Sequence, residues 1–264
     1  MTAAEPCEWS LAAERLLTDG SYRPDGSVLA ELRLSCNDVE AVAAGVRPLG
    51  MTARAYLRFC EDLLHALDRE GVTDADVRIQ GSSVRFYAHA AKRMPFDEVA
   101  PHAVDRTRLW QVIDEGGRIP DEDVLDDATQ HLDQVWPTAD RPARRPFDAL
   151  FRCAVHTDPS DYDVQVSSDQ MIELVQQQMV RAGVDPGRIT STHPHYAFVR
   201  KRYAEEYFLY VTQWSARQSE RLGRSVSWAL FPSCGPQEAP DGDLSSHFRD
   251  SDWIIRRPGE DQGR

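Results

Sequence analysis

Lysine is almost absent from this sequence of 264 residues. Only Lys92 and Lys201 occur, whereas arginine is abundant, and acidic residues outnumber basic ones so that the formal net charge is −13. We do not expect a chain that is acidic overall to hold long duplex nucleic acid by charge. Local basic segments remain candidates for phosphate contacts. They are Arg141, Arg144, Arg145 and Arg152, and the run from Arg200 to Arg202.

Long apolar runs and regular cysteine spacings are also missing. No stretch approaches the roughly 18 apolar residues that a membrane span needs, and the segment from Met1 to Glu14 lacks the pattern of a signal peptide. The five cysteines are scattered and odd in number. The sequence therefore predicts neither a disulfide framework nor a zinc ribbon, and it favours a protein of the reducing cytoplasm with no membrane partner.

The motifs of several common enzyme classes do not occur. The sequence contains neither Gly-x-x-x-x-Gly-Lys-Ser/Thr nor Gly-x-Gly-x-x-Gly, which argues against P-loop and Rossmann folds. It has no Gly-x-Ser-x-Gly elbow of a serine hydrolase. His193 and His195 have no cysteine or carboxylate at recognisable ligand spacing, so a zinc site is not indicated.

Changes in pattern divide the chain into four regions. A helical N-terminal region is followed by a core of strands and helices, and a proline-broken, acidic stretch with helical periodicity interrupts that core. A C-terminal extension with a late apolar stretch and a polar tail completes the chain. The predicted boundaries are 1–75 for the N-terminal region, 76–94 and 147–236 for the core, 95–146 for the helical insertion and 237–264 for the extension.

Asp161 and Asp163 stand out among several Asp-x-Asp pairs because of their context. Tyr162, Val164 and Val166 alternate with polar residues, which predicts a strand with both carboxylates on one face. Like charges on a rigid strand repel unless a cation lies between them or water screens them. The pair therefore predicts a site for Mg²⁺ or Mn²⁺, and the alternative is a solvated edge strand.

A second motif, Gly81-Ser82-Ser83, follows the short extended run from Val77 to Gln80 and precedes an apolar segment at 84–91 that is expected to be helical. Glycine lets the backbone approach a phosphate closely, and the serine hydroxyls can donate hydrogen bonds to it. The order of strand, small-residue turn and helix is typical of a phosphate-binding turn, although Gly-Ser-Ser also occurs in ordinary loops.

The ordered combination of Val77–Ser83 with Asp161-Tyr162-Asp163-Val164 resembles the polymerase-β-like nucleotidyltransferase superfamily. The resemblance implies an α+β fold with a small mixed or antiparallel sheet of the nucleotidyltransferase type and flanking helices. It further implies that Gly81, Ser82 and Ser83 hold a nucleoside triphosphate. Asp161 and Asp163 would bind the metal ions that bridge its phosphates and activate an acceptor hydroxyl.

This sequence departs from the family's pattern in two places. Residues 84–160 separate Ser83 from Asp161, far more than the usual short gap, so an insertion is required. The family often carries a third carboxylate on a neighbouring strand, yet the expected strand at 226–231 has none. Asp250 and Asp252 are candidates if the stretch at 253–255 joins the sheet, and Glu205 and Glu206 are helical alternatives.

Three basic residues complete the predicted nucleotide site. Lys92 follows the expected helix after Ser83, and Arg200 and Lys201 follow an apolar segment; each could contact a phosphate or be solvated.

The leading hypothesis is a metal-dependent nucleotidyltransferase that moves a nucleoside monophosphate from a nucleoside triphosphate to a hydroxyl on RNA, a small molecule or a protein. The alternative is a non-catalytic nucleotide-binding or interaction module derived from that fold, of the kind found in toxin or defence systems.

Overall fold

The computed structural model describes residues 7–88, 134, 136, 141–153, 157–190, 198–233 and 252–257. The chain divides into two compact units, each assembled from two segments. The first unit consists of Met1–Ala53 and Gly81–Ser160, and the second of Arg54–Gln80 and Asp161–Arg264. Among the described residues, no helix has both the length and the apolar character needed to cross a membrane.

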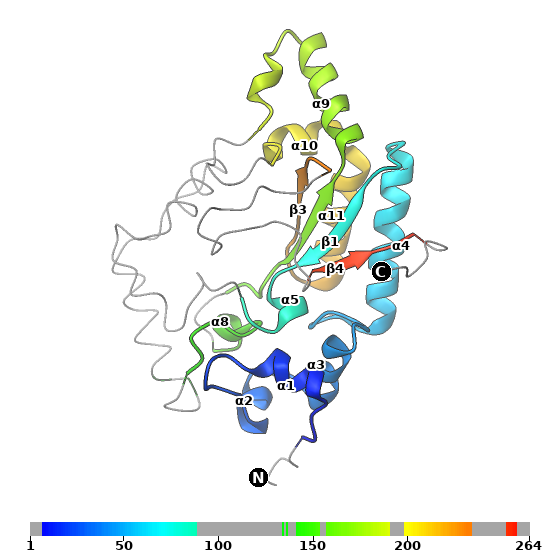
Figure 1. Cartoon of the computed structure of the whole chain (residues 1–264). Coiled ribbons are helices and arrows are strands. Elements are labelled where there is room, and N and C mark those ends of the chain that lie inside the picture. Colours follow the sequence, from blue (N-terminus) through cyan, green and yellow to red (C-terminus); the bar gives the residue numbers. More distant parts are fainter. Residues whose placement is uncertain are drawn as a thin grey trace. The chain divides into compact units, whose positions relative to one another are not determined.

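A mixed four-stranded sheet forms the centre of the second unit. Its strands are β1 (Asp76–Gln80), β2 (Tyr162–Ser167), β3 (Val226–Phe231) and β4 (Trp253–Ile255), and they lie in the order β3-β2-β1-β4. β1 is antiparallel to both β2 and β4, whereas β2 and β3 are parallel. The α+β class with a small mixed sheet is thus confirmed, and the expected strands at 162–166 and 226–231 are present (Figure 1).

One face of this sheet is apolar and packs against two helices, α4 (Ala53–Arg69) and α11 (Leu209–Leu222). Phe59 of α4 makes edge-on ring contacts with Tyr162 of β2 and with Trp214 of α11. The Trp214 indole also donates a hydrogen bond to the Phe59 carbonyl at 3.2 Å. All three rings are fully buried, so this aromatic cluster joins strand and helices in one core.

Helix α9 (Asp169–Arg181) begins directly after β2 because Ser168 caps it, its hydroxyl accepting the N–H of Met171 at 3.0 Å. Ser168 also donates to Asp74, and the Gln170 N–H donates to the same carboxylate at 2.9 Å. Helix α10 (Lys201–Tyr207) directly precedes α11. Phe208 separates them with a non-helical backbone (φ −114°, ψ 73°).

The described residues of the first unit form short helices, and α1, α2 and α3 begin at a side-chain N-cap. The helices are α1 (Leu11–Leu17), α2 (Gly26–Glu31), α3 (Cys36–Ala43), α5 (Ser82–Arg85) and α8 (Ala149–Arg152). Asp25 caps α2, and Ser35 with Asp38 forms a capping box on α3. α2 and α3 are separate helices, because Arg33, two residues after the end of α2, takes a left-handed conformation (φ 52°) before the cap at Ser35.

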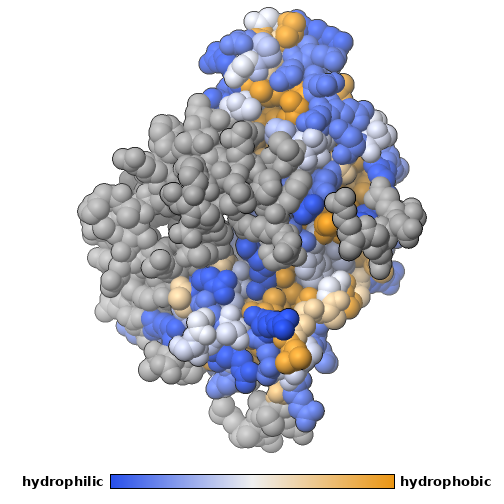
Figure 2. Space-filling view, in the orientation of Figure 1, coloured by the Kyte–Doolittle hydropathy of each residue, from blue (hydrophilic) through white to orange (hydrophobic). Residues whose placement is uncertain are grey.

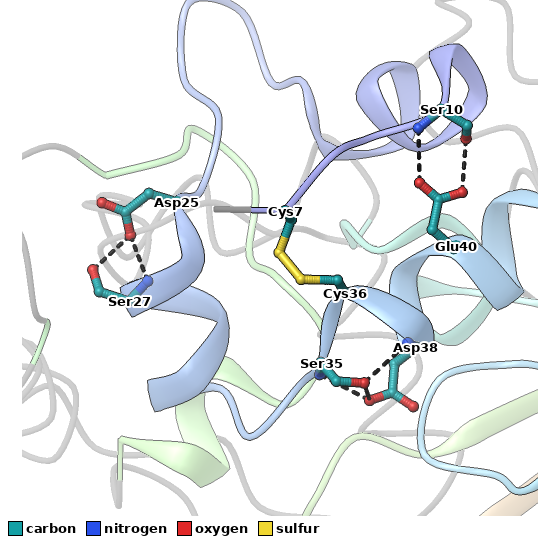
Figure 3. The surroundings of a disulfide bond; sticks show 8 residues. All are labelled: Cys7, Ser10, Asp25, Ser27, Ser35, Cys36, Asp38 and Glu40. Atoms are coloured by element: carbon teal, nitrogen blue, oxygen red, sulfur yellow. Dashed lines mark hydrogen bonds between the residues drawn. A yellow bond between two sulfur atoms is a disulfide. The ribbon is translucent and has the colours of Figure 1, made fainter. Parts of the chain in front are cut away.

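The sequence indicated no disulfide framework, yet the structure pairs two of the cysteines. Cys7 and Cys36 form a disulfide that joins the segment before α1 to the first residue of α3 (Figure 3). Beside it, Ser10 donates from its backbone N–H and its hydroxyl to the Glu40 carboxylate, both at 2.8 Å. The pairing could not be read from spacing, because contact between α1 and α3 brings the two cysteines together across 29 residues.

Helices occupy the described chain before Asp76, as the sequence indicated, and α4 belongs to the sheet unit from Arg54 onward. The predicted insertion at 95–146 lies mainly outside the described residues, as do Lys92, Asp250, His193 and His195.

Candidate functional site

The second face of the sheet is polar over much of β1 and β2. Alternation places Asp76, Arg78 and Gln80 of β1 on the same face as Asp163, Gln165 and Ser167 of β2. The register aligns Gln80 with Asp163, and Asp163 with Ser227 of β3. Asp252 lies one residue before Trp253, which pairs with Ile79. Four residues therefore form a polar row across one end of the sheet: Ser227, Asp163, Gln80 and Asp252.

Asp163 is half-buried, and the Ser227 hydroxyl donates a hydrogen bond to its Oδ1 at 2.8 Å. Its Oδ2 has no hydrogen-bond partner among the residues that the structure describes. Asp161 is exposed and lies immediately before β2, two residues from Asp163. Because Asp161 is outside the strand, the expectation that the two carboxylates share one face stays a prediction.

Behind Asp163, a buried network connects the other polar side chains. The Gln80 amide nitrogen donates to Gln165 Oε1 at 2.7 Å and to Asp252 Oδ2 at 3.0 Å. The Gln165 amide nitrogen in turn donates to the Ser167 hydroxyl at 3.0 Å. Gln165, Ser167 and Asp252 are almost completely buried. Since burying such groups is costly unless they are hydrogen-bonded, the network fixes the side chains on this face.

The stretch at 253–255 does join the sheet, which was the condition for Asp252 to act as a third carboxylate. However, Asp252 lies beside Gln80, on the opposite side of β1 from Asp163. Neighbouring strands are about 4.8 Å apart, so two strand spacings separate the backbones that carry the two carboxylates. Ser227 occupies the position on β3 that is paired with Asp163. Of the two helical alternatives for the third carboxylate, Glu205 forms an ion pair within α10, with 3.9 Å between its Oε1 and Lys201 Nζ.

In the first unit, the turn Gly81-Ser82-Ser83 has the backbone that its glycine predicts. Gly81 has φ 89° and ψ −171°, a region that is essentially restricted to glycine. The Ser83 side chain is buried, and its hydroxyl has no hydrogen-bond partner among the described residues. The Ser83 carbonyl accepts the N–H of Leu49 at 2.8 Å. These features give a turn that is rigid and locally well packed.

The helix expected after this turn is much shorter than predicted. It ends at Arg85, because Phe86 takes a left-handed conformation (φ 66°). Tyr87 then forms an antiparallel bridge with Pro146, and its hydroxyl donates to the Leu17 carbonyl at 2.8 Å. Buried aromatic side chains at 86 and 87 thus redirect the chain, an effect of packing that apolar periodicity does not reveal.

Arg200 and Lys201 lie near the other end of the sheet. The N–H of Val199 donates to the carbonyl of Leu230, three residues along β3 from Ser227, which corresponds to about 10 Å. The Arg200 guanidinium donates to the Thr190 carbonyl at 3.0 Å. Lys201 is exposed and begins α10. Their backbones are thus separated from the polar row along the strand direction.

An open groove of about 880 Å³ lies on the second unit between α9 and the short 3₁₀ helix η1 (Pro186–Arg188). Val180, Arg181 and Ile189 contribute to its lining. Figure 2 shows apolar residues among hydrophilic ones in this area, at the top of the view. No motif or pattern in the sequence indicated this groove, and its lining contains no member of the polar row.

The oxygen donors of the polar row fit a hard divalent cation that is bound together with a phosphorylated ligand. Among the described residues, no group of three His, Cys, Asp or Glu side chains is arranged to hold a metal ion. Mg²⁺ commonly binds through one or two carboxylates and completes its shell with water and substrate phosphates. Asp163 and Asp161 supply carboxylates of the type that such a site uses.

Searches of family models, curated proteins and solved structures found no match to this chain. Functional interpretation therefore depends on the residues themselves. Sequence analysis did not single out Gln80, Gln165 or Ser227. In the sequence these three are only polar residues within strands. The strand register is needed to show that they lie on the same face as Asp163.

Proposed function

We propose that this protein is a divalent-cation-dependent nucleotidyltransferase, which transfers a nucleoside monophosphate from a nucleoside triphosphate to an acceptor hydroxyl. The observation that carries the proposal is the register of β1 and β2. Gln80, the last residue of β1, pairs with Asp163, and the chain continues from Gln80 into the turn Gly81-Ser82-Ser83. The mixed sheet and the partly exposed Asp163 support it.

In this proposal, Asp163 and Asp161 hold the cation, which would neutralise charge on the triphosphate during in-line transfer. Ser227 fixes the orientation of Asp163 through the hydrogen bond to Oδ1, so that Oδ2 is available. The part of the turn in this proposal is to contact phosphate oxygens through Ser82 and the backbone at Gly81, because the Ser83 side chain is buried. The acceptor would be a hydroxyl of RNA, a small molecule or a protein. The acidic overall charge favours a short or small acceptor over long duplex nucleic acid.

Binding of a nucleoside triphosphate tests the proposal. We would measure it by titration calorimetry with and without Mg²⁺ for the wild type, Asp163→Asn and Glu220→Gln. Glu220 is an exposed carboxylate on α11 and serves as the matched control for loss of one negative charge. Loss of Mg²⁺-dependent binding only in Asp163→Asn supports the proposal. Equal binding by all three proteins refutes the role of Asp163.

A second function is favoured by one observation, the presence of Ser227 where β3 pairs with Asp163. A site with two carboxylates can bind a nucleotide with its cation and lack the charge to drive transfer. The chain would then be a nucleotide-binding or interaction module. Release of pyrophosphate, measured with the four common nucleoside triphosphates and with RNA, serine-containing peptides or sugars as acceptors, separates the two functions.

A further inference from the structure

The Gln80 side chain is held by both of its amide hydrogens. One points to Gln165 Oε1 at 2.7 Å and the other to Asp252 Oδ2 at 3.0 Å. A glutamine amide has two N–H donors and one carbonyl oxygen. With both donors occupied, Oε1 is the remaining polar atom, and it accepts no hydrogen bond from any described residue.

The direction of this network is set by Asp252. An ionised carboxylate only accepts hydrogen bonds, whereas an amide or hydroxyl can both donate and accept. Gln165 and Ser167 could therefore be satisfied in either direction. Asp252, which is only 7% exposed, requires the donor end of Gln80 to face it. The Gln80 carbonyl oxygen is consequently turned away from Asp252 and from Gln165.

This oxygen belongs to the neighbour of Asp163. Gln80 and Asp163 are paired across the antiparallel strands, and side chains so paired have Cβ atoms about 4.5–5.5 Å apart on the same face. Ser227 occupies Oδ1 of Asp163 from the other side. The row thus offers two oxygens on neighbouring strands that no described residue binds, a carboxylate oxygen on Asp163 and an amide oxygen on Gln80.

We propose that Gln80 supplies a neutral oxygen to the hydrated divalent cation held by Asp163, and that Asp252 is the positioning residue that turns this oxygen toward it. The inference rests on the proposed function, since it assumes that Asp163 binds a cation. A carbonyl oxygen is a suitable partner for Mg²⁺ or Mn²⁺, either directly or through a bound water molecule. Partners of this kind orient the ligands of a metal and tune its affinity.

A purely structural role for the network makes a different prediction. If Gln80 and Asp252 only satisfy each other's hydrogen bonds, changing them alters stability but leaves cation affinity unchanged in any variant that folds. Exchanging the chemical groups between the two positions separates the roles. In Gln80→Glu/Asp252→Asn, the new amide donates to the new carboxylate, and Gln165 can reverse to match.

The affinity for Mn²⁺ alone, measured by electron paramagnetic resonance of the free ion, tests the inference. We expect Gln80→Leu to weaken binding about 10- to 100-fold. The exchanged double variant should bind at least as tightly as the wild type, because a charged oxygen replaces a neutral one. Gln213→Leu, at an exposed position of α11, is the matched control. Thermal unfolding identifies variants that have lost the fold.

Failure of this inference is distinguishable from failure of the proposed function. If Asp163→Asn abolishes Mn²⁺ binding while folded Gln80→Leu and the exchanged variant bind like the wild type, the role of Gln80 is refuted and the role of Asp163 stands. If the wild type binds Mn²⁺ no better than Asp163→Asn, both are refuted. If Gln80→Leu weakens binding and the exchange restores it, the inference holds whether or not pyrophosphate is released.

Discussion

Reduction of the Cys7–Cys36 disulfide should loosen the helices that it joins. The bond closes a loop with a sequence separation of 29 residues. In the chain-entropy model, opening a loop of this length costs about 3.6 kcal/mol of folding free energy, which is roughly 400-fold in an unfolding equilibrium constant. This value is an upper limit, because structure retained in the reduced, unfolded chain makes the contribution smaller.

Amide hydrogen exchange resolved by peptide is the appropriate assay, since the two units need not unfold together. Adding a thiol reductant should raise exchange in peptides of α1 and α3 by up to that factor, and it should leave α9 and β3 unchanged. The double variant Cys7→Ser/Cys36→Ser is the control, because reductant should have no further effect on it.

Alkylation of the thiols tests whether the Cys7–Cys36 disulfide is formed in the native protein. Burial raises the pKa of the Cys60 thiol to about 11, and burial also raises the pKa of Cys153, so both should alkylate slowly at neutral pH. If Cys7 and Cys36 are alkylated in the native protein without reductant, or if reduction leaves exchange in α1 and α3 unchanged, the reasoning is wrong.

Three further changes have defined outcomes. Trp214→Ala removes a fully buried ring from its contact with Phe59 and should cost about 3–5 kcal/mol in denaturant unfolding; a loss below 1 kcal/mol would contradict the packing. Gly81→Ala places a side chain at φ 89° and should lower the free energy of unfolding by about 1–3 kcal/mol in the same measurement. An unchanged free energy of unfolding would mean that the turn has another conformation. Burial raises the pKa of the Asp38 carboxyl, but hydrogen bonds from Ser35 and from Arg47, together with the Arg47 charge, outweigh it and lower the pKa. The stabilisation from Asp38 is therefore present above its unfolded pKa and is lost as pH falls through the lowered folded-state pKa. Asp38→Asn should thus destabilise the protein more at pH 7 than at pH 3. An equal loss of stability at both pH values would show that the ionised carboxylate does not cause the stabilisation.

Local signals in the sequence predicted a good part of the second unit. Alternation identified β2, and the strand expected at 226–231 is β3. These two predictions held because a short strand is specified largely by the pattern of neighbouring residues.

What could not be predicted depends on partners far away in the chain. The break between α2 and α3 follows from a left-handed Arg33, a conformation that the residue type does not favour. The hydrogen bonds of Gln80 reach 85 residues to Gln165 and 172 residues to Asp252. Glutamine in a strand carries no signal of such partners, so the network around Asp163 became visible only with the register.

The position of β4 in the chain sets an order for assembly. A protein is synthesised from its N-terminus, and closing a long loop slows the pairing of its ends. β1 can pair with β2 well before the stretch that contains Asp252 has been made. During that interval the Gln80 amide has no carboxylate to orient it, and the network can adopt either direction. The polar row would thus reach its final arrangement only when β4 joins the sheet. A shortened chain that ends before Asp252 would keep Asp163, but its Gln80 amide would not be oriented.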